Sequence, residues 1–245
     1  MDKIPLETNE GEFQVRFRDC FSVRYIQAAS LLCRLGYEVE TGVTGTCEIP
    51  SELVLRHEAF VLNSILSSVA FLESNINELY ADAADNAYYF SDPDHEALLR
   101  TIGERWQNEK NFDRAPMATK YQRILAIAER EQFCESDPVF TDILTLIEIR
   151  NYLMHYKREW IVVVNDSSCG TARETGGEKL GNYLRDRFAL NPLAHPRAPF
   201  FPDQCLGFGC AEWAVNQSLA FTDEFFRRLD LPAPYEGIRK DLATK

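Results

Sequence analysis

The sequence predicts an all-α fold organised around one main helical bundle. Apolar residues recur at spacings of three, four and seven positions over most of its length, which is the period of helices with one buried face. The clearest strand-like composition is WIVVVND, residues 160–166, and a single such run is weak evidence for a sheet. With 245 residues and 45% hydrophobic content, the chain is long enough to bury a substantial core.

Residues 1–50 are predicted to form an N-terminal extension, an appendage to that bundle. Residues 13–20 alternate as a strand does, and the apolar positions that follow have helical spacing over about residues 20–35, with Gly36 as the predicted stop. A turn-rich link then leads to Pro50.

The main bundle is predicted to span residues 51–232, and residues 233–245 form a C-terminal tail. The first helix of the bundle carries the longest apolar stripe in the chain, and later helices begin after Asp or Pro residues. The predicted helices cover about residues 52–84, 94–108, a stretch after Pro116, 138–158 and 210–230.

A Pro- and Gly-rich insertion is predicted over residues 165–209, between the last two helices. Connections of this length are commonly functional or mobile. Its segment GTARETGGEKLG, residues 170–181, contains glycines but lacks the strand-to-helix pattern of a phosphate-binding loop, so we expect a mobile loop there.

The composition narrows the classes of function. A formal net charge of −12 argues against broad binding to nucleic acid, although a local site for one phosphate remains compatible with it. The start of the chain lacks a basic and apolar signal segment, and no run of about 18 uncharged apolar residues predicts a membrane span. We therefore expect a cytoplasmic protein without membrane contact.

The seven cysteines indicate reduced thiols rather than a disulfide framework, because their number is odd and their positions are scattered. Cys205 and Cys210 are the only close pair, and no second pair of ligands stands near them at zinc spacing. We expect neither a metal nor a cofactor.

The segment LIEIRNYLMHYKREW, residues 146–160, carries the candidate site. Arg150 and Asn151 stand together in an apolar helical run, and His155 follows four residues after the asparagine. At about 100° per residue, Asn151 and His155 share one helix face, whereas Arg150 points about 140° away from His155. Two copies of this helix, antiparallel across a twofold axis, would place Arg and His in one cleft.

Such a cleft suits metal-independent cleavage of RNA. An imidazole can take the proton from a 2′-hydroxyl near neutral pH, and an always-charged guanidinium can stabilise the charge that grows on the phosphate. His155 and Arg150 are the candidates for these roles, and the amide of Asn151 can hold the helix end or the phosphate.

This motif resembles the signature of the HEPN domains, α-helical bundles of toxin-antitoxin, abortive-infection and other antiviral systems. The signature is an Arg, a polar residue that is often Asn, a few more residues and a His near the end of a late helix; here it runs from Arg150 to His155, preceded by Glu148. The resemblance covers about residues 52–230. It implies a HEPN-like antiparallel bundle.

Active members of that family are ribonucleases that dimerise, so that two motifs form one site and leave a cyclic phosphate. The resemblance therefore implies a homodimer, an RNA substrate, and catalytic roles for Arg150 and His155 with Asn151 in support. It also allows an antitoxin or a nucleotidyltransferase as partner. Some members carry a modified tyrosine two residues beyond the His, where this chain has Lys157, with Tyr156 one residue earlier.

Residues around the motif are candidates for supporting roles. Glu73 falls on the apolar stripe of the long helix, where it either faces the cleft and orients Arg150 or lies at the edge of the stripe in water. The remaining supporting candidates are Glu148, Tyr156, Lys157 and Arg158.

Other interpretations stand beside the nuclease. Arg150 and His155 can simply stabilise a helix C-terminus through its dipole. A non-catalytic HEPN-like module would use the same helix to dimerise or to bind a protein. In a third alternative, a plain helical regulatory protein acts through residues 165–209. The other histidines, His57, His95 and His195, have no partners at catalytic spacing and are predicted to lie at the surface.

Overall fold

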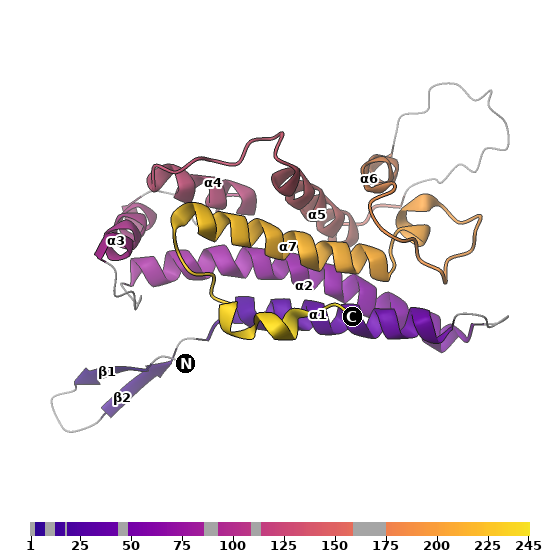
Figure 1. The fold of residues 1–245 in the computed structure, drawn as a ribbon, viewed down its shortest axis with the longest axis horizontal. Coiled ribbons are helices and arrows are strands. Elements are labelled where there is room, and N and C mark those ends of the chain that lie inside the picture. Colours follow the sequence, from indigo (N-terminus) through magenta and orange to yellow (C-terminus); the bar gives the residue numbers. More distant parts are fainter. Residues whose placement is uncertain are drawn as a thin grey trace.

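The protein is an all-α bundle with one small hairpin, which confirms the predicted fold class (Figure 1). The hairpin pairs strand β1 (Lys3–Glu7) with strand β2 (Phe13–Phe17) in antiparallel register. The computed structural model describes residues 3–7, 13–17, 19–43, 49–85, 93–108, 114–158 and 175–245. The strand-like run at residues 160–166 lies outside the described residues.

Among the described elements, the first two helices form the most extensive contact. Helix α1 (Phe21–Gly42) runs antiparallel to helix α2 (Ser51–Ala84), because Ser22 of α1 hydrogen-bonds Glu78 near the end of α2, and Glu40 pairs with His57 near its start. The interpretation of residues 1–50 as an appendage is therefore wrong for α1. The buried face of α1 supplies part of the core.

Helix α1 also continues past its predicted stop. Gly36 is buried in the contact with α2, where a Cβ would lie 3.5 Å from Val61 Cγ2, and Val39 extends the buried face for another turn. A glycine that packs against a neighbouring helix gives the same sequence signal as a glycine that ends one.

The predicted long helix is confirmed as α2, which is the central helix of the bundle. Its side chains Ile65, Leu72 and Ile76 have no solvent-exposed surface. By length and composition α2 is the one helix in the described part of the chain that could span a membrane, but half of its most apolar window is buried inside the protein. That burial is what a core helix of a bundle shows.

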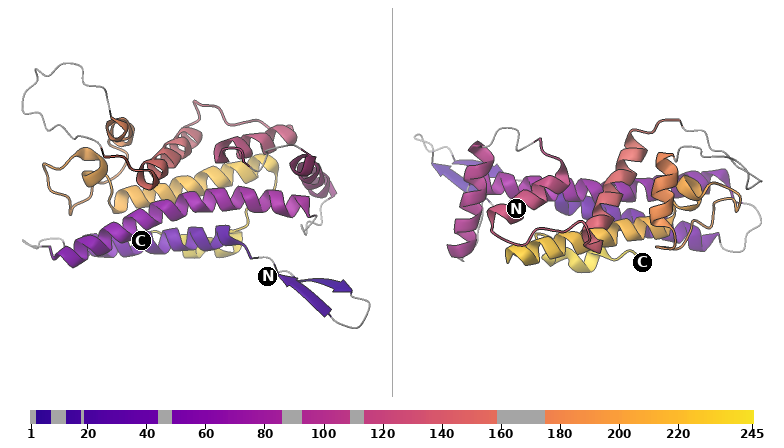
Figure 2. Two further views of the ribbon diagram at one scale, coloured as in Figure 1. Left: turned by 180° about the vertical axis from the view of Figure 1, so that it is seen from behind. Right: turned by 90° about the horizontal axis from the view of Figure 1, so that it is seen from above.

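Helix α7 (Phe208–Leu229) packs against both α1 and α2 (Figure 2). Its N-terminal residue Phe208 lies near the start of α2, and Ser218 contacts the backbone of Ser68 further along. Helices α2 and α7 are therefore parallel, so the antiparallel arrangement expected for the bundle holds for α1 and α2 but not for α7. Four intervening helices return the chain to the start of α2.

Helices α3, α4 and α5 form the first part of that return. Helix α3 (Pro93–Asn108) crosses the end of α2, and a Cβ on Gly103 would lie only 2.3 Å from the Ala83 carbonyl oxygen. Helices α4 (Met117–Ile127) and α5 (Pro138–Met154) then lie over α7 and α2.

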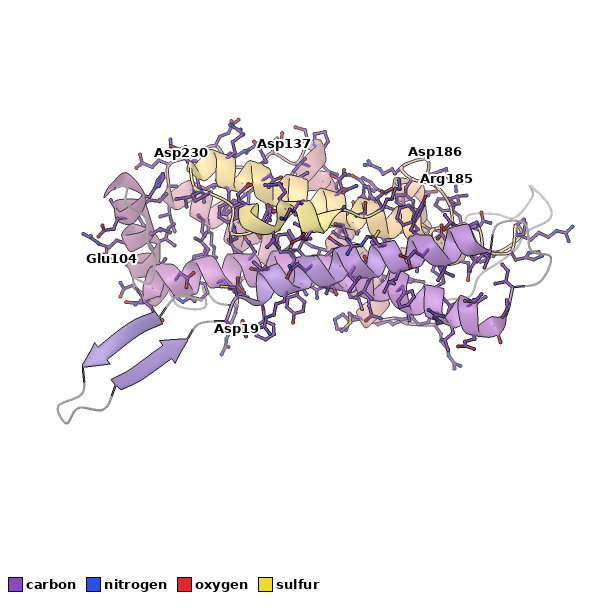
Figure 3. All side chains as sticks on the ribbon, turned by 60° about the horizontal axis from the view of Figure 1, so that its bottom comes forward. Asp19, Glu104, Asp137, Arg185, Asp186 and Asp230 are labelled. Carbon is purple, nitrogen blue, oxygen red and sulfur yellow. The ribbon has the colours of Figure 1, made fainter. Side chains whose placement is uncertain are left out.

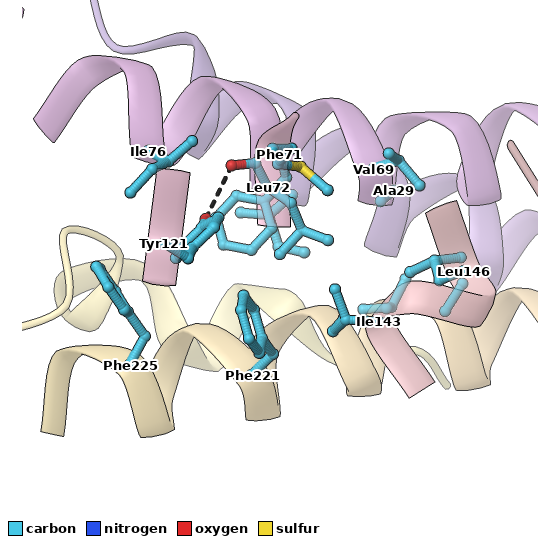
Figure 4. Close-up of a cluster of buried hydrophobic side chains, with 14 of the residues drawn as sticks. Ala29, Val69, Phe71, Leu72, Ile76, Tyr121, Ile143, Leu146, Phe221 and Phe225 are labelled. Carbon is cyan, nitrogen blue, oxygen red and sulfur yellow. Dashed lines mark hydrogen bonds between the residues drawn. The ribbon is translucent and has the colours of Figure 1, made fainter. Parts of the chain in front are cut away.

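Aromatic side chains fill the space between α2, α4 and α7 (Figure 4). Tyr121 packs edge-on against both Phe221 and Phe225, with ring centroids 4.8 and 4.7 Å apart. Its hydroxyl donates to the Leu72 carbonyl at 2.8 Å, so the buried phenol has a partner. Burial raises its pKa well above the ordinary value.

The insertion over residues 165–209 is more ordered than predicted wherever the structure describes it. Helix α6 (Gly176–Leu184) stands where a mobile loop was expected, because Thr175 and Glu178 form a capping box at its start. Tyr183 then donates to Asp142 of α5 at 2.8 Å, which fixes α6 to the bundle. A short turn, Phe200–Gln204, with extended backbone at Phe201, precedes α7.

The C-terminal tail also belongs to the bundle. A 3-10 helix, Glu236–Leu242, packs against α1. The buried Tyr235 hydroxyl bonds Thr222 and donates to Asp223, both at 2.6 Å. The division at residue 233 therefore does not separate a tail from the core.

Candidate active site

Helix α5 places the Arg–Asn–His motif at its C-terminal end. Pro138 occupies the first turn, and the fully buried Ile143, Leu146 and Ile149 pin the helix to the core. The helix ends at Met154, four residues before the predicted end, and His155 is the residue that caps it. The motif thus lies in the last turns, as predicted.

Arg150 contacts the carboxylate that the sequence analysis singled out. Its Nη2 lies 4.0 Å from Glu73 Oε2 on α2, and the two side chains are 29% and 41% exposed. Glu73 therefore combines features of both predicted alternatives, because it lies within ion-pair distance of Arg150 and is also partly exposed to water.

A second cation reaches the same carboxylate. Lys120 of α4 lies 3.5 Å from Glu73 Oε1 and donates to Asn77 Oδ1 at 2.8 Å, while its side chain is only 4% exposed. We call these four residues, Glu73, Asn77, Lys120 and Arg150, the Glu73 cluster. It joins α2, α4 and α5 and carries a net charge of one positive unit, from two cations and one anion.

Sequence reasoning missed Lys120, although a signal for it exists. Met117, Lys120, Tyr121 and Ile124 follow the helical spacing of one buried face, so a lysine interrupts that stripe just as Glu73 interrupts its own. Two opposite charges, each alone in an apolar stripe, are candidates for a pair between helices.

The remaining motif residues face solvent. Asn151 and His155 are exposed, and the His155 amide donates to the Asn151 carbonyl at 2.9 Å, as an ordinary helix end requires. No hydrogen bond or ion pair within the described part of the chain joins the Arg150 side chain to that of His155. One copy of the protein therefore does not bring the two into contact.

The supporting candidates surround this helix end. Glu148, Lys157 and Arg158 are exposed. Tyr156 is 54% exposed and packs edge-on against Tyr152, with ring centroids 5.5 Å apart. Apart from Glu73, none of the supporting candidates contacts Arg150 through a hydrogen bond or ion pair among the described residues.

His57 is the sequence prediction that fails most clearly. It was expected at the surface, but it has no exposed area and its Nε2 lies 2.7 Å from Glu40 Oε1. Glu40 lies on α1, which the sequence analysis assigned to an appendage, so the partner could not be anticipated. His195 is exposed as predicted, and His95 is half-buried.

Three cysteines, Cys33, Cys205 and Cys210, are buried as free thiols where α1 meets α7. Burial raises the pKa of Cys33 to about 12. A hydrogen bond with Cys205, together with burial, raises the pKa of Cys210 well above its ordinary value. Among the described side chains, no group of three or more His, Cys, Asp or Glu residues is arranged to hold a metal ion.

Comparisons with known protein families, with curated proteins and with solved structures find no match to this chain.

Proposed function

We propose that the protein is a metal-independent endoribonuclease of HEPN type, of the kind used in toxin or antiviral defence systems. The observation that carries the proposal is the placement of the motif. Arg150 is held half-buried by Glu73 at the end of α5, while Asn151 and His155 lie exposed at the same end. Metal-independent cleavage of a phosphodiester requires a guanidinium and an imidazole at one phosphate, and this helix end carries one of each.

The proposed site needs two copies of the chain. Within one copy Arg150 and His155 point to different sides of the helix, about 140° apart. A homodimer that pairs the two α5 ends across a twofold axis would bring both motifs to one RNA strand. The exposed cations Lys157 and Arg158 would then flank the phosphate in an otherwise acidic protein.

In the proposed reaction, one His155 takes the proton from a 2′-hydroxyl, and the resulting oxyanion attacks the adjacent phosphorus. The bond to the 5′-oxygen breaks, and that oxygen receives a proton from the protonated His155 of the second copy. The products are a cyclic phosphate and a 5′-hydroxyl end. Arg150 stabilises the negative charge on the phosphoryl oxygens during this step.

The test uses purified protein and a short single-stranded RNA in the presence of EDTA. Wild type should cleave and leave cyclic phosphate ends, and His155→Ala should lower the rate by about 100-fold or more. His195→Ala, a second exposed histidine outside the motif, should retain wild-type activity. Equal cleavage by His155→Ala, or products with 3′-hydroxyl ends, would refute the mechanism.

A non-catalytic dimerisation or protein-binding module is the second candidate. The observation that favours it is the exposed apolar surface beside the motif, where Met154 is 60% and Tyr156 is 54% exposed. It predicts a dimer in light scattering that Met154→Asp with Tyr156→Asp disrupts, together with no RNA turnover.

A further inference from the structure

A cavity lies beside the proposed active site but does not include its catalytic residues. It has a volume of about 500 Å³ and is bounded by the first half of α2, the end of α5 and the segment 191–206. That volume is typical of sites for small ligands. Tyr152, which lines it, lies about 200° around α5 from Arg150, so the cavity opens on a different side of the helix.

The walls of the cavity are mainly apolar. Val61 is buried and Leu62, Leu153, Pro202 and Leu206 are half-buried, all of them lining residues. Such walls favour a ligand with an apolar body, because burial of that body removes its surface from water.

Two acids and one exposed histidine, His195, stand at the rim. Glu58 and Asp203 line the cavity and are exposed, and neither carboxylate has a hydrogen-bond or ion-pair partner among the described residues. No described lysine or arginine lines the cavity. Two unpaired carboxylates in a lining without lysine or arginine favour a positively charged ligand and disfavour phosphates and carboxylic acids.

A buried histidine adds a third acceptor. His57 lines the cavity with no exposed area, and its Nδ1 has no hydrogen-bond partner. Glu40 Oε1, which also accepts the Phe208 amide at 2.6 Å, takes the proton on His57 Nε2. With the proton on Nε2, Nδ1 is left as an acceptor in the wall of the cavity, and a ligand that donates a hydrogen bond would give it a partner.

Two aromatic rings stand at the same opening. Tyr152 and Tyr156 both line the cavity and pack edge-on against each other. Faces of aromatic rings attract organic cations, especially where water is partly excluded. Acceptors, carboxylates and aromatic rings thus all favour the same kind of ligand.

We infer that this cavity binds a small organic cation, a primary amine on an apolar body. The apolar part packs between Val61 and Leu153, and the ammonium group lies among Glu58, Asp203 and His57. The inference does not rest on the proposed nuclease activity, because it concerns binding at residues outside the motif.

The first test compares three probes of one shape, phenylbutylamine, phenylbutanol and phenylbutyrate, near neutral pH. Calorimetry should show the amine binding about tenfold more tightly than the alcohol, and the carboxylate most weakly. Methyl NMR should place the amine-induced shifts at Val61, Leu62 and Leu153. Absence of amine binding, or binding of phenylbutyrate at least as tightly, would overturn the inference.

Variants then test which residues recognise the charge. The double variant Glu58→Gln with Asp203→Asn should weaken amine binding by about tenfold and leave phenylbutanol unaffected. Glu104→Gln is the matched control, because Glu104 lies on α3 (Figure 3) and does not line the cavity. This variant should bind the amine as wild type does. Ala194→Phe, which fills the cavity, should abolish binding while circular dichroism stays native. Unchanged affinity in both cavity variants would overturn the proposed site.

Discussion

Helices α2 and α5 contribute to both the Glu73 cluster and the cavity, but the carboxylate of the cluster is paired and those at the cavity are unpaired. Between Glu73 and Val61, α2 rises by twelve residues, or about 18 Å. At the cluster a glutamate has cations from two other helices at 3.5 and 4.0 Å, and one of them is nearly buried. At the cavity, Glu58 and Asp203 are unpaired and exposed beside apolar walls.

The paired charges of the Glu73 cluster stabilise the fold, whereas the unpaired carboxylates of the cavity are available to a ligand. A buried lysine loses its favourable hydration. Without a carboxylate nearby, no electrostatic attraction would offset that loss. An exposed glutamate keeps its water and contributes little to stability. Removing the two kinds of glutamate should therefore have different consequences.

The largest expected effect concerns Arg150, the member of the cluster that also belongs to the motif. Replacement by alanine should lower RNA cleavage by about 100-fold or more, because charge on the phosphate loses its stabilising group. Arg150→Lys should keep the attraction to Glu73 but lose the planar fork, and so should recover only part of the rate. A full rate in Arg150→Ala, measured on the same RNA as His155→Ala, would limit Arg150 to a structural role.

A smaller effect should distinguish the two glutamates of α2 by stability. Glu73→Ala leaves the buried Lys120 with Asn77 alone, so the free energy of unfolding should fall by about 1–3 kcal/mol. Glu58→Ala, the matched change on the same helix, should stay within about 0.5 kcal/mol of wild type. Urea titrations followed by circular dichroism give both values. Equal losses would show that the pairing of Glu73 does not matter to stability.

The smallest effect is a pH dependence at a third carboxylate, Glu224 of α7. Hydrogen bonds from Arg227 hold the pKa of Glu224 at about 2, with Arg228 as a second donor. Because the folded pKa lies below the unfolded one, Glu224 stabilises the protein at neutral pH, and this contribution is lost as the pH falls from about 4.5 towards 2. Glu224→Gln should flatten the fall in melting temperature over that range. A variant with the wild-type acid profile would contradict this assignment.

The long helices could be predicted because their apolar stripes are long and regular. The interior of α1 was harder, since Gly36 is a packing residue and not a stop. Helix α6 was missed although Thr175 and Glu178 have the spacing of a capping box, because the surrounding glycines and prolines outweighed that signal. Local patterns identify helices better than they identify the contacts between helices.

The same limit applies to the candidate site. Glu73 was found because a carboxylate interrupts an apolar stripe, but the stripe alone could not decide between a contact with Arg150 and an edge position in water. His57 was misplaced because Glu40 lies seventeen positions earlier, on a helix that was not expected in the core. The cavity could not be predicted at all, since three segments distant in sequence line it.

The proposed cleavage of RNA by the Arg150–His155 motif can be tested by inducing the protein in a bacterial host and then analysing total RNA. Wild type should arrest growth and produce new RNA fragments, whereas His155→Ala at equal soluble level should do neither and His195→Ala should act as wild type. Intact RNA and normal growth with soluble, folded wild type would contradict the nuclease and favour the non-catalytic module.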